Sequence, residues 1–286
     1  MKVAVVTDSG SNIYHEKVTM EGLYKVPLQV IDGERGYREG IEITIDETYD
    51  MVAQGKMLKT SLPLVGDIVD LFTQLKEKGY QLIFGVPITT GLSSTIPAMV
   101  TAAKQVGIDF EYFDCYTTAM VQLECALGAR RLFDKGASVE LVKERLQEAI
   151  DHSVTFVLPT DLMHLSRGGR LAPTAAKIAG FLKINPVLYL NEETQGKIEN
   201  YHLTRTMKRA QKMALDYFKE KGVGEGFRIC VTHVKAIEDG QRFLAMVEEA
   251  FPKAEAYLVD LISVVGVHTG IGCVATQFIK KVDTDI

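Results

Sequence analysis

The chain has 286 residues, which is enough for one large domain or two ordinary domains at roughly 100–200 residues each. Hydrophobic residues make up 47% and charged residues 24%, a globular composition that excludes wholesale disorder and a fibrous repeat. The 32 basic and 37 acidic side chains leave a net charge of −5, so the sequence has no electrostatic footprint for nucleic acid or an anionic membrane.

The cysteines and the N-terminal segment indicate the compartment. No two cysteines form a CxxC pair, and none lies in a Cys/His cluster with zinc spacing, so we predict buried thiols and no structural metal. They are Cys115, Cys125, Cys230 and Cys273. Asp8 interrupts the first apolar stretch where a signal peptide would still be apolar, and no run approaches the roughly 18 apolar residues of a transmembrane segment. We therefore expect a protein of the reducing cytoplasm.

Short β-branched segments alternate with helical patterns over the first half of the chain. The expected strands cover residues 3–7, 25–31, 80–86 and 110–114. Apolar residues recur at three- and four-residue spacing between these strands. In one stretch they are Ile68, Leu71, Phe72 and Leu75. This alternation predicts an α/β fold with a mostly parallel, Rossmann-like sheet.

The rhythm changes near residues 151–159. We expect an N-terminal α/β domain at residues 1–158 and a C-terminal α/β domain at residues 159–286. Strand candidates in the second half cover residues 156–158, 184–190, 197–203, 228–233, 257–261 and 274–279. Helical patterns lie near residues 204–221 and 239–250. Residues 191–196 separate two strand candidates as a hairpin loop does, so the second sheet is predicted to be mixed.

Polar residues follow the first expected strand, at the edge where open α/β sheets bind ligands. The segment is Thr7-Asp8-Ser9-Gly10. It either contributes to a ligand site or caps the next helix, with Gly10 permitting the turn. It contains neither GxGxxG nor GxxxxGK[ST], which argues against a nucleotide phosphate cradle and against a dinucleotide-dependent dehydrogenase. No cofactor is predicted.

Two further hydroxyl-bearing segments fall at the same expected sheet edge. Thr60 and Ser61 precede a helical pattern, and Ser93 and Ser94 follow the strand at residues 80–86 and open another helix. Neutral hydroxyls and N–H groups at a helix N-terminus suit a carboxylate or phosphate, because they offer hydrogen bonds without a fixed countercharge. Helix capping is the alternative role for each hydroxyl.

Two glycine-rich segments of the second half hold the remaining candidates. Arg170 follows Gly168 and Gly169, which permit positive φ or close backbone approach. It either presents a forked cation to the cleft between the domains or stays solvated on a surface turn. His268 lies in a glycine-rich loop at residues 266–272, and it either contacts a ligand or is structural.

The sequence contains no complete set of catalytic residues that can be recognised from its motifs. The sequence has no GxSxG elbow, no HExxH and no acidic cluster typical of metal-assisted phosphoryl transfer. Ser93 and His268 are the candidates for a nucleophile and its base, but their spacing fixes no geometry between them. The residues therefore do not support an enzyme.

Five motifs taken together resemble those of the DegV family of bacterial proteins. They are Thr7-Asp8-Ser9 for TDS, Thr60-Ser61-Leu62-Pro63 for TSxPS, Gly91-Leu92-Ser93-Ser94-Thr95 for GLSGT, Leu165 to Leu171 for LxxGGRI, and His268-Thr269-Gly270-Ile271-Gly272 for HTGPG. Their order and spacing cover nearly the whole chain. The resemblance implies two α/β domains with a tunnel between them that holds one long-chain fatty acid.

The resemblance also implies a partner. Members of this type serve as the fatty-acid-binding subunit of bacterial fatty acid kinase. A separate ATP-dependent subunit phosphorylates the bound carboxylate to an acyl phosphate, which feeds phospholipid synthesis. This chain would present the substrate and hold no ATP, in agreement with the missing phosphate loop.

Individual residues carry over from the family's motifs. The matching positions are Thr60 or Ser61, Ser93, His268, Arg170 and Arg205. The hydroxyls would bind the carboxylate, with His268 nearby. Arg170 matches the GGR arginine, which is expected to contact the ligand or the partner. Arg205 matches an RTxxKA-like segment and is a candidate for docking the kinase.

The chain departs from the family pattern at four positions. Leu64 replaces the second serine of TSxPS, and Ser94 replaces the glycine of GLSGT. Ile96 replaces the usual aromatic residue, and Ile271 replaces the proline of HTGPG. These changes bear on the shape of the head-group site and the tunnel mouth, and Ser94 joins the candidate ligand-binding residues.

Two other functions stay open beside the fatty-acid carrier. One is a serine-dependent acyl hydrolase or transferase that uses Ser93 with His268 as base. The other is a binding module for another apolar anion, such as a polyisoprenoid or a small lipid phosphate. Burying about a dozen methylenes contributes on the order of 10 kcal/mol before association costs, which suits a lipid. Neutral hydroxyls would also leave a carboxylate free to attack a γ-phosphate.

Overall fold

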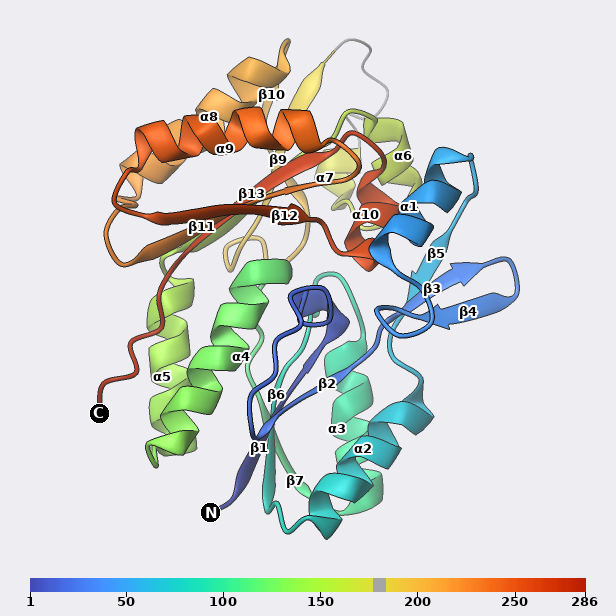
Figure 1. Cartoon of the computed structure of the whole chain (residues 1–286), viewed down its shortest axis with the longest axis vertical. Helices are drawn as coiled ribbons and strands as arrows, with labels where there is room; N and C mark the ends of the chain where they lie inside the picture. Colours follow the sequence, from blue (N-terminus) through green and yellow to red (C-terminus); the bar gives the residue numbers. More distant parts are fainter. Residues whose placement is uncertain (177–183) are drawn as a thin grey trace.

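Two lobes and a small side sheet make up the computed structural model, which describes residues 1–176 and 184–286. A four-stranded sheet forms the centre of the first lobe, and a six-stranded sheet forms that of the second (Figure 1). A three-stranded sheet lies beside the junction. The expected class, two α/β lobes with a parallel first sheet and a mixed second sheet, is confirmed.

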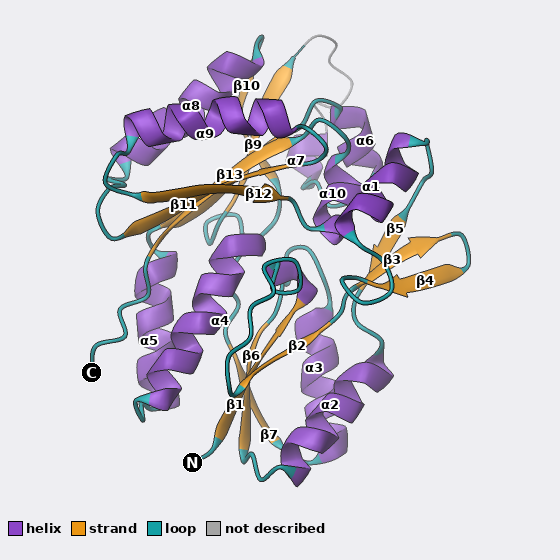
Figure 2. Ribbon diagram, in the orientation of Figure 1, coloured by secondary structure: helices purple, strands orange, loops and turns teal. Residues whose placement is uncertain are grey.

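All pairings in the four-stranded sheet are parallel, and its order is β2-β1-β6-β7. The strands are β1 (Val3–Asp8), β2 (Leu23–Val26), β6 (Leu82–Val86) and β7 (Asp109–Tyr112). Helices flank both faces (Figure 2), so β1 and β6 are buried along their whole length. On one face lie α2 (Val65–Glu77) and α3 (Thr95–Val106), and on the other α4 (Ala119–Asp134) and α5 (Val139–Ile150).

The six-stranded sheet has the order β10-β9-β8-β13-β11-β12, in which β11 and β12 alone are parallel. Its strands are β8 (Ser153–Leu158), β9 (Asn185–Leu190), β10 (Glu199–Thr204), β11 (Phe227–His233), β12 (Glu255–Asp260) and β13 (Val274–Lys280). The outer face packs against α8 (Met207–Glu220) and α9 (Ile237–Ala250). Residues 191–196 form the predicted hairpin between β9 and β10.

The side sheet was not predicted. It has the antiparallel order β4-β3-β5, with β3 (Gln29–Asp32), β4 (Arg35–Arg38) and β5 (Lys59–Ser61). The single strand expected at residues 25–31 is therefore wrong, since β2 and β3 belong to different sheets. Pro27 lies between them and has no N–H for a ladder. The N–H of Leu28 donates to Ser9 Oγ at 2.9 Å instead of to a strand.

The sheets divide the chain at a different point from the boundary expected at residues 158/159. β8 pairs with β9 and β13, so residues 153–158 belong to the second lobe. The pattern of a single strand does not reveal which sheet it joins. The segment with α1 (Ile45–Ala53) also packs on the second lobe, where the Tyr49 hydroxyl donates to the Leu261 carbonyl. A Cβ at Gly266 would overlap the Tyr49 ring, so this contact requires glycine.

The remaining structural features concern the cysteine thiols, the apolarity of the helices and possible metal-binding groups. All four cysteines are free thiols in buried positions, as predicted. No helix in the described part of the chain has the length and apolarity needed to cross a membrane. Within residues 1–176 and 184–286, no three His, Cys, Asp or Glu side chains are grouped so as to hold a metal ion.

Candidate functional site

A cavity of about 500 Å³ lies between the lobes, next to the side sheet. Its volume is typical of small-molecule sites, which span roughly 300–1,000 Å³. Much of its wall is aliphatic and comes from both lobes. These residues include Leu28, Leu62, Ile88, Leu92, Leu171 and Ile198. The cavity has the position and the kind of wall that a tunnel for an acyl chain requires.

The predicted head-group residues all line this cavity. They are Thr60, Ser61, Ser93, Ser94, Arg170 and His268. They come from β5, the loop before α3, the turn after α6 (Leu162–Arg167) and α10 (Ser263–Thr269). A short helix, α7 (Pro173–Ala176), follows that turn. Arg205 does not line the cavity and is exposed between β10 and α8.

A hydrogen bond joins two of these residues across the lobes. Thr60 Oγ1 and His268 Nε2 lie 2.7 Å apart. His268 is 9% exposed and occupies the last turn of α10, so its expected position in a loop is wrong. Gly266 and Gly270 suggested a loop, but Gly266 makes room for Tyr49, and Gly270, at φ 82°, ends the helix.

His268 is held in its neutral form. Burial, followed by the nearby Arg170 and His164, lowers the pKa of His268 to about 3. A neutral imidazole has one N–H donor and one acceptor nitrogen. With the hydrogen on Nε2, His268 donates to Thr60 Oγ1, and the Thr60 hydroxyl hydrogen is then available to a ligand.

The hydroxyls before α3 do not cap that helix. Ser94 occupies the N-cap position without a side-chain capping bond, and it is exposed. The half-buried Ser93 has its Oγ 2.8 Å from Thr95 Oγ1. The N-terminus of the 12-residue α3 therefore adjoins the cavity with two hydroxyls that are not used as caps. Its dipole favours an anion here.

Arg170 lies at the cavity in a tight glycine turn. Its Nη1 donates to the Gly168 carbonyl at 2.8 Å, and its side chain is half-buried. A Cβ at Gly168 would come within 2.7 Å of His268 Nδ1, and Gly169 has φ 72°, so both expected uses of the double glycine occur. Arg170 and Lys197 are the charged residues among the described lining, which contains no carboxylate.

The loop that carries Ser93 packs directly on the second lobe. A Cβ at Gly91 would overlap the backbone of Gly196 in the β9–β10 hairpin, so the two backbones approach closely. Thr90 also anchors this loop, since its N–H and hydroxyl donate to Asp114 Oδ2 at 3.0 and 2.6 Å. These contacts set the position of Ser93 relative to the second lobe.

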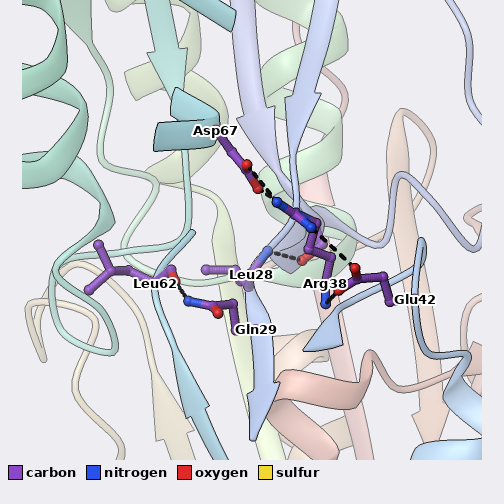
Figure 3. A network of polar contacts seen from close by, with 7 residues as sticks. Leu28, Gln29, Arg38, Glu42, Leu62 and Asp67 are labelled. Atoms are coloured by element: carbon purple, nitrogen blue, oxygen red, sulfur yellow. Dashed lines mark hydrogen bonds and ion pairs between the residues drawn. The ribbon is translucent and has the colours of Figure 1, made fainter. Parts of the chain in front are cut away.

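A network in the side sheet holds the segment after Thr60 and Ser61. Arg38 donates from Nε and Nη2 to the two carboxylate oxygens of Asp67, at 2.7 and 2.9 Å (Figure 3). Gln29 Nε2 donates to the Leu62 carbonyl at 2.9 Å. The first contact ties the side sheet to the first turn of α2, and the second ties it to the connection between β5 and α2. The sequence gives no signal for this network, because a charged pair 29 residues apart has no local pattern.

The segment after β1 has a structural role. Asp8 is fully buried and accepts from Gly10 N at 2.8 Å, Ile88 N at 2.9 Å and Gln122 Nε2 at 3.0 Å. Burial raises the pKa of Asp8 to about 6, although these hydrogen bonds oppose the shift. Asp8 caps the short helix η1 (Ser9–Ser11), so the capping interpretation is the correct one.

Glu39 is a buried acid that the sequence analysis did not single out. It follows β4, is 4% exposed and accepts from the Ser9 hydroxyl at 2.6 Å. Its other oxygen accepts from Val264 N, in the first turn of α10, at 3.0 Å. Burial raises the pKa of Glu39 to about 7. Glu39 therefore connects the first lobe, the side sheet and the helix that carries His268.

The fold and the cavity together define a two-lobed α/β protein whose interlobe cavity combines aliphatic side chains with hydroxyls, an imidazole and two cationic side chains. The family model described as "Uncharacterised protein, DegV family" matches residues 2–281. The chain belongs to the DegV family.

Curated relatives match over nearly the full length. A DegV domain-containing protein of Streptococcus pneumoniae is 32% identical, and the alignment covers 99% of this chain and all of the relative. Protein DegV of Bacillus subtilis is 31% identical, over 95% of this chain and 97% of the relative.

Solved structures match the fold closely. A fatty acid binding DegV family protein from Streptococcus agalactiae has a TM-score of 0.89 and 28% identity, covering 98% of this chain and 99% of its own. A stearic acid-binding protein from Eubacterium ventriosum has a TM-score of 0.83 and 27% identity, and the match covers both chains completely.

Proposed function

We propose that this chain binds one long-chain fatty acid between its lobes, with the carboxylate at Thr60, Ser93 and His268. The observation that carries the proposal is the meeting of hydroxyls and a neutral imidazole in a cavity with aliphatic wall residues from both lobes, whose described lining contains no carboxylate. Structural relatives described as fatty acid binding and stearic acid-binding support it.

The head group is held by neutral donors. In this proposal the Thr60 hydroxyl donates to one carboxylate oxygen, while Thr60 Oγ1 accepts from His268 Nε2 in the tautomer that carries its hydrogen there; the two atoms lie 2.7 Å apart. This favours Thr60 over Ser61 as the residue that binds the carboxylate, because the Thr60 hydroxyl is oriented by a buried partner, His268. Ser93, in the first lobe, donates to the same carboxylate. Arg170 and Lys197 add a favourable potential without a bidentate clamp.

The acyl tail supplies most of the affinity. Each buried methylene contributes roughly 0.8 kcal/mol, so the aliphatic walls favour a long chain. Head-group contacts then serve to satisfy the buried carboxylate and to orient it.

The bound carboxylate is presented to a separate ATP-dependent kinase subunit, which forms an acyl phosphate for phospholipid synthesis. Neutral donors support this role, because they leave carboxylate lone pairs free to attack a γ-phosphate. The exposed Arg205 is the proposed docking residue, together with Arg170 near the head group. The chain itself acts as a binding subunit in this scheme.

An acyl hydrolase is less compatible with the observed contacts. Such an enzyme needs a base within hydrogen-bond reach of its nucleophile. His268 Nε2 instead contacts Thr60, and Ser93 contacts Thr95. The geometry therefore favours a binding protein.

Binding to delipidated protein tests the proposal. Stearic acid, stearyl alcohol and stearyl phosphate have equal tails and different head groups, and calorimetry measures their affinities. We expect the acid to bind at least about tenfold more tightly than the alcohol, since the alcohol lacks the charge that the site stabilises. Tighter binding of the phosphate would favour the lipid phosphate alternative, and equal binding of acid and alcohol would contradict the head-group assignment.

A reconstituted reaction tests the kinase role. With ATP and the ATP-dependent subunit of a bacterial fatty acid kinase, stearic acid should become an acyl phosphate only when this chain is added. Equal product without the chain would contradict substrate presentation. Turnover of an acyl ester by the chain alone would revive the hydrolase alternative.

A further inference from the structure

A second, smaller cavity adjoins the inner side of the proposed ligand site. It has a volume of about 30 Å³ and shares lining residues Leu92, Ile198, Val265 and Thr269 with the large cavity. The rest of its lining comes from the start of α4 and from the face of the six-stranded sheet that is turned toward the first lobe. The site therefore extends toward this sheet, and the sheet residues that line the small cavity are called its blind end below.

Gln277 lies at that blind end in a fully used hydrogen-bond network. It is 2% exposed and lines the small cavity. Its Nε2 donates to Thr155 Oγ1 at 2.7 Å and to the Thr118 carbonyl at 3.0 Å. Its Oε1 accepts from Met120 N at 3.1 Å. Both ends of the amide are thus partnered, by β8 on one side and by the start of α4 in the other lobe.

Such a side chain resists displacement. Moving Gln277 aside would leave its buried donor and acceptor without partners, and Met120 N would lose its acceptor, whereas Thr155 would keep its bond to Thr117 Oγ1. One additional methylene at the end of a tail gains less than this network loses. A chain that fills the small cavity therefore stops at Gln277.

We propose that Gln277 sets the length of the acyl chain that this protein prefers. The inference rests on the proposed fatty-acid binding, in which Thr60 and His268 fix the carboxylate. With one end of the ligand fixed there and the other limited by Gln277, affinity peaks at one chain length. Shorter tails leave the small cavity unfilled, and longer tails must break the network or bend.

Two substitutions on β13 move the blind end in opposite directions. Gln277→Ala removes the limit, and Ala275→Leu fills the small cavity, which Ala275 also lines. Ala275 and Gln277 lie on the same face of β13 because side chains alternate along a strand. Thr276→Val is the matched control, since Thr276 lies between them on the opposite face and is fully buried.

Calorimetric affinities for saturated fatty acids of increasing length provide the measurement. Gln277→Ala should favour longer acids and Ala275→Leu shorter ones, each changing the affinity ratio of neighbouring lengths by about fourfold, the factor for burying one methylene. Thr276→Val should keep the wild-type preference.

If both cavity variants bind fatty acid with the wild-type preference, the length limit is refuted. If Gln277→Ala fails to fold, Ala275→Leu decides alone. If the wild type binds none of the acids, the proposed function itself fails, and this inference fails with it.

Discussion

Two polar motifs of the first lobe look alike in sequence and differ in the structure. Thr7-Asp8-Ser9 lies at the carboxyl end of β1, and the segment around Ser93 follows β6, at the same edge of the parallel sheet. Asp8 and Ser9 are buried, and their side chains bind backbone groups and other side chains. Ser93 is half-buried and lines the cavity. Position at a sheet edge therefore identifies candidates, but the partners of each side chain separate a structural role from a ligand-binding role.

The comparison predicts opposite phenotypes for the two motifs. Substitutions in the first should change the free energy of unfolding, whereas substitutions in the second should change ligand affinity. If substitutions in both motifs changed the free energy of unfolding and the ligand affinity to the same extent, the distinction would be contradicted.

Asp8→Ala should have the largest effect on stability. It leaves the buried N–H groups of Gly10 and Ile88 without an acceptor, and the Gln122 amide loses one of its acceptors but keeps Thr7 Oγ1 and the Val86 carbonyl. We expect a loss of about 3 kcal/mol in the free energy of unfolding, measured by urea denaturation. Asp8→Asn should lose less, because its amide oxygen still accepts and the raised pKa of Asp8 shows that burial disfavours the charge. Equal losses in the two variants would contradict this account.

Ser93→Ala and Thr60→Val should weaken fatty-acid binding about 10- to 100-fold, equivalent to about 1–3 kcal/mol. Each variant removes one proposed carboxylate donor, and titration of delipidated protein with stearic acid measures the loss. Thr60→Val also deprives His268 of its partner.

Ser138→Ala is the control for these two variants. Ser138 caps α5 by accepting from Leu141 N and lies away from the cavity residues. It should lower stability by about 1 kcal/mol and leave affinity unchanged. Wild-type affinity in both Ser93→Ala and Thr60→Val would rule out the head-group assignment.

Glu39→Gln should show a smaller, pH-dependent effect. The pKa of Glu39 is raised to about 7 from 4.5, so the folded protein binds this proton more tightly than the unfolded chain. Wild-type stability is therefore lost as pH rises from about 4.5 through 7, and the glutamine variant lacks this loss. The stability of Glu39→Gln relative to wild type should rise by about 1 kcal/mol between pH 5 and pH 6. A constant difference across this range would contradict the raised pKa.

The alternation of strands and helices could be predicted from the sequence, because apolar residues recur with different spacing in buried parallel strands and in the helices that cover them. The side sheet could not be predicted in this way, since the aliphatic residues between positions 25 and 31 have the pattern of a single strand. Pro27 was the available signal for the break, because proline cannot continue a ladder.

The head-group residues were found through motifs, whereas their mutual contacts required the structure. Nothing in the sequence joins Thr60 to His268, which are 208 residues apart. Glu39 and Gln277 escaped notice because single polar residues in amphipathic segments look like solvent-facing ones. Their burial depends on packing between distant elements, which local patterns do not encode.

Native mass spectrometry of the protein purified from a bacterial host tests the central claim most directly. The account predicts a complex whose mass exceeds that of the chain by one long-chain fatty acid, released on denaturation, with reduced occupancy in Ser93→Ala. A wild-type protein that is recovered folded with the mass of the bare chain, and that stays so after incubation with stearic acid, would contradict it.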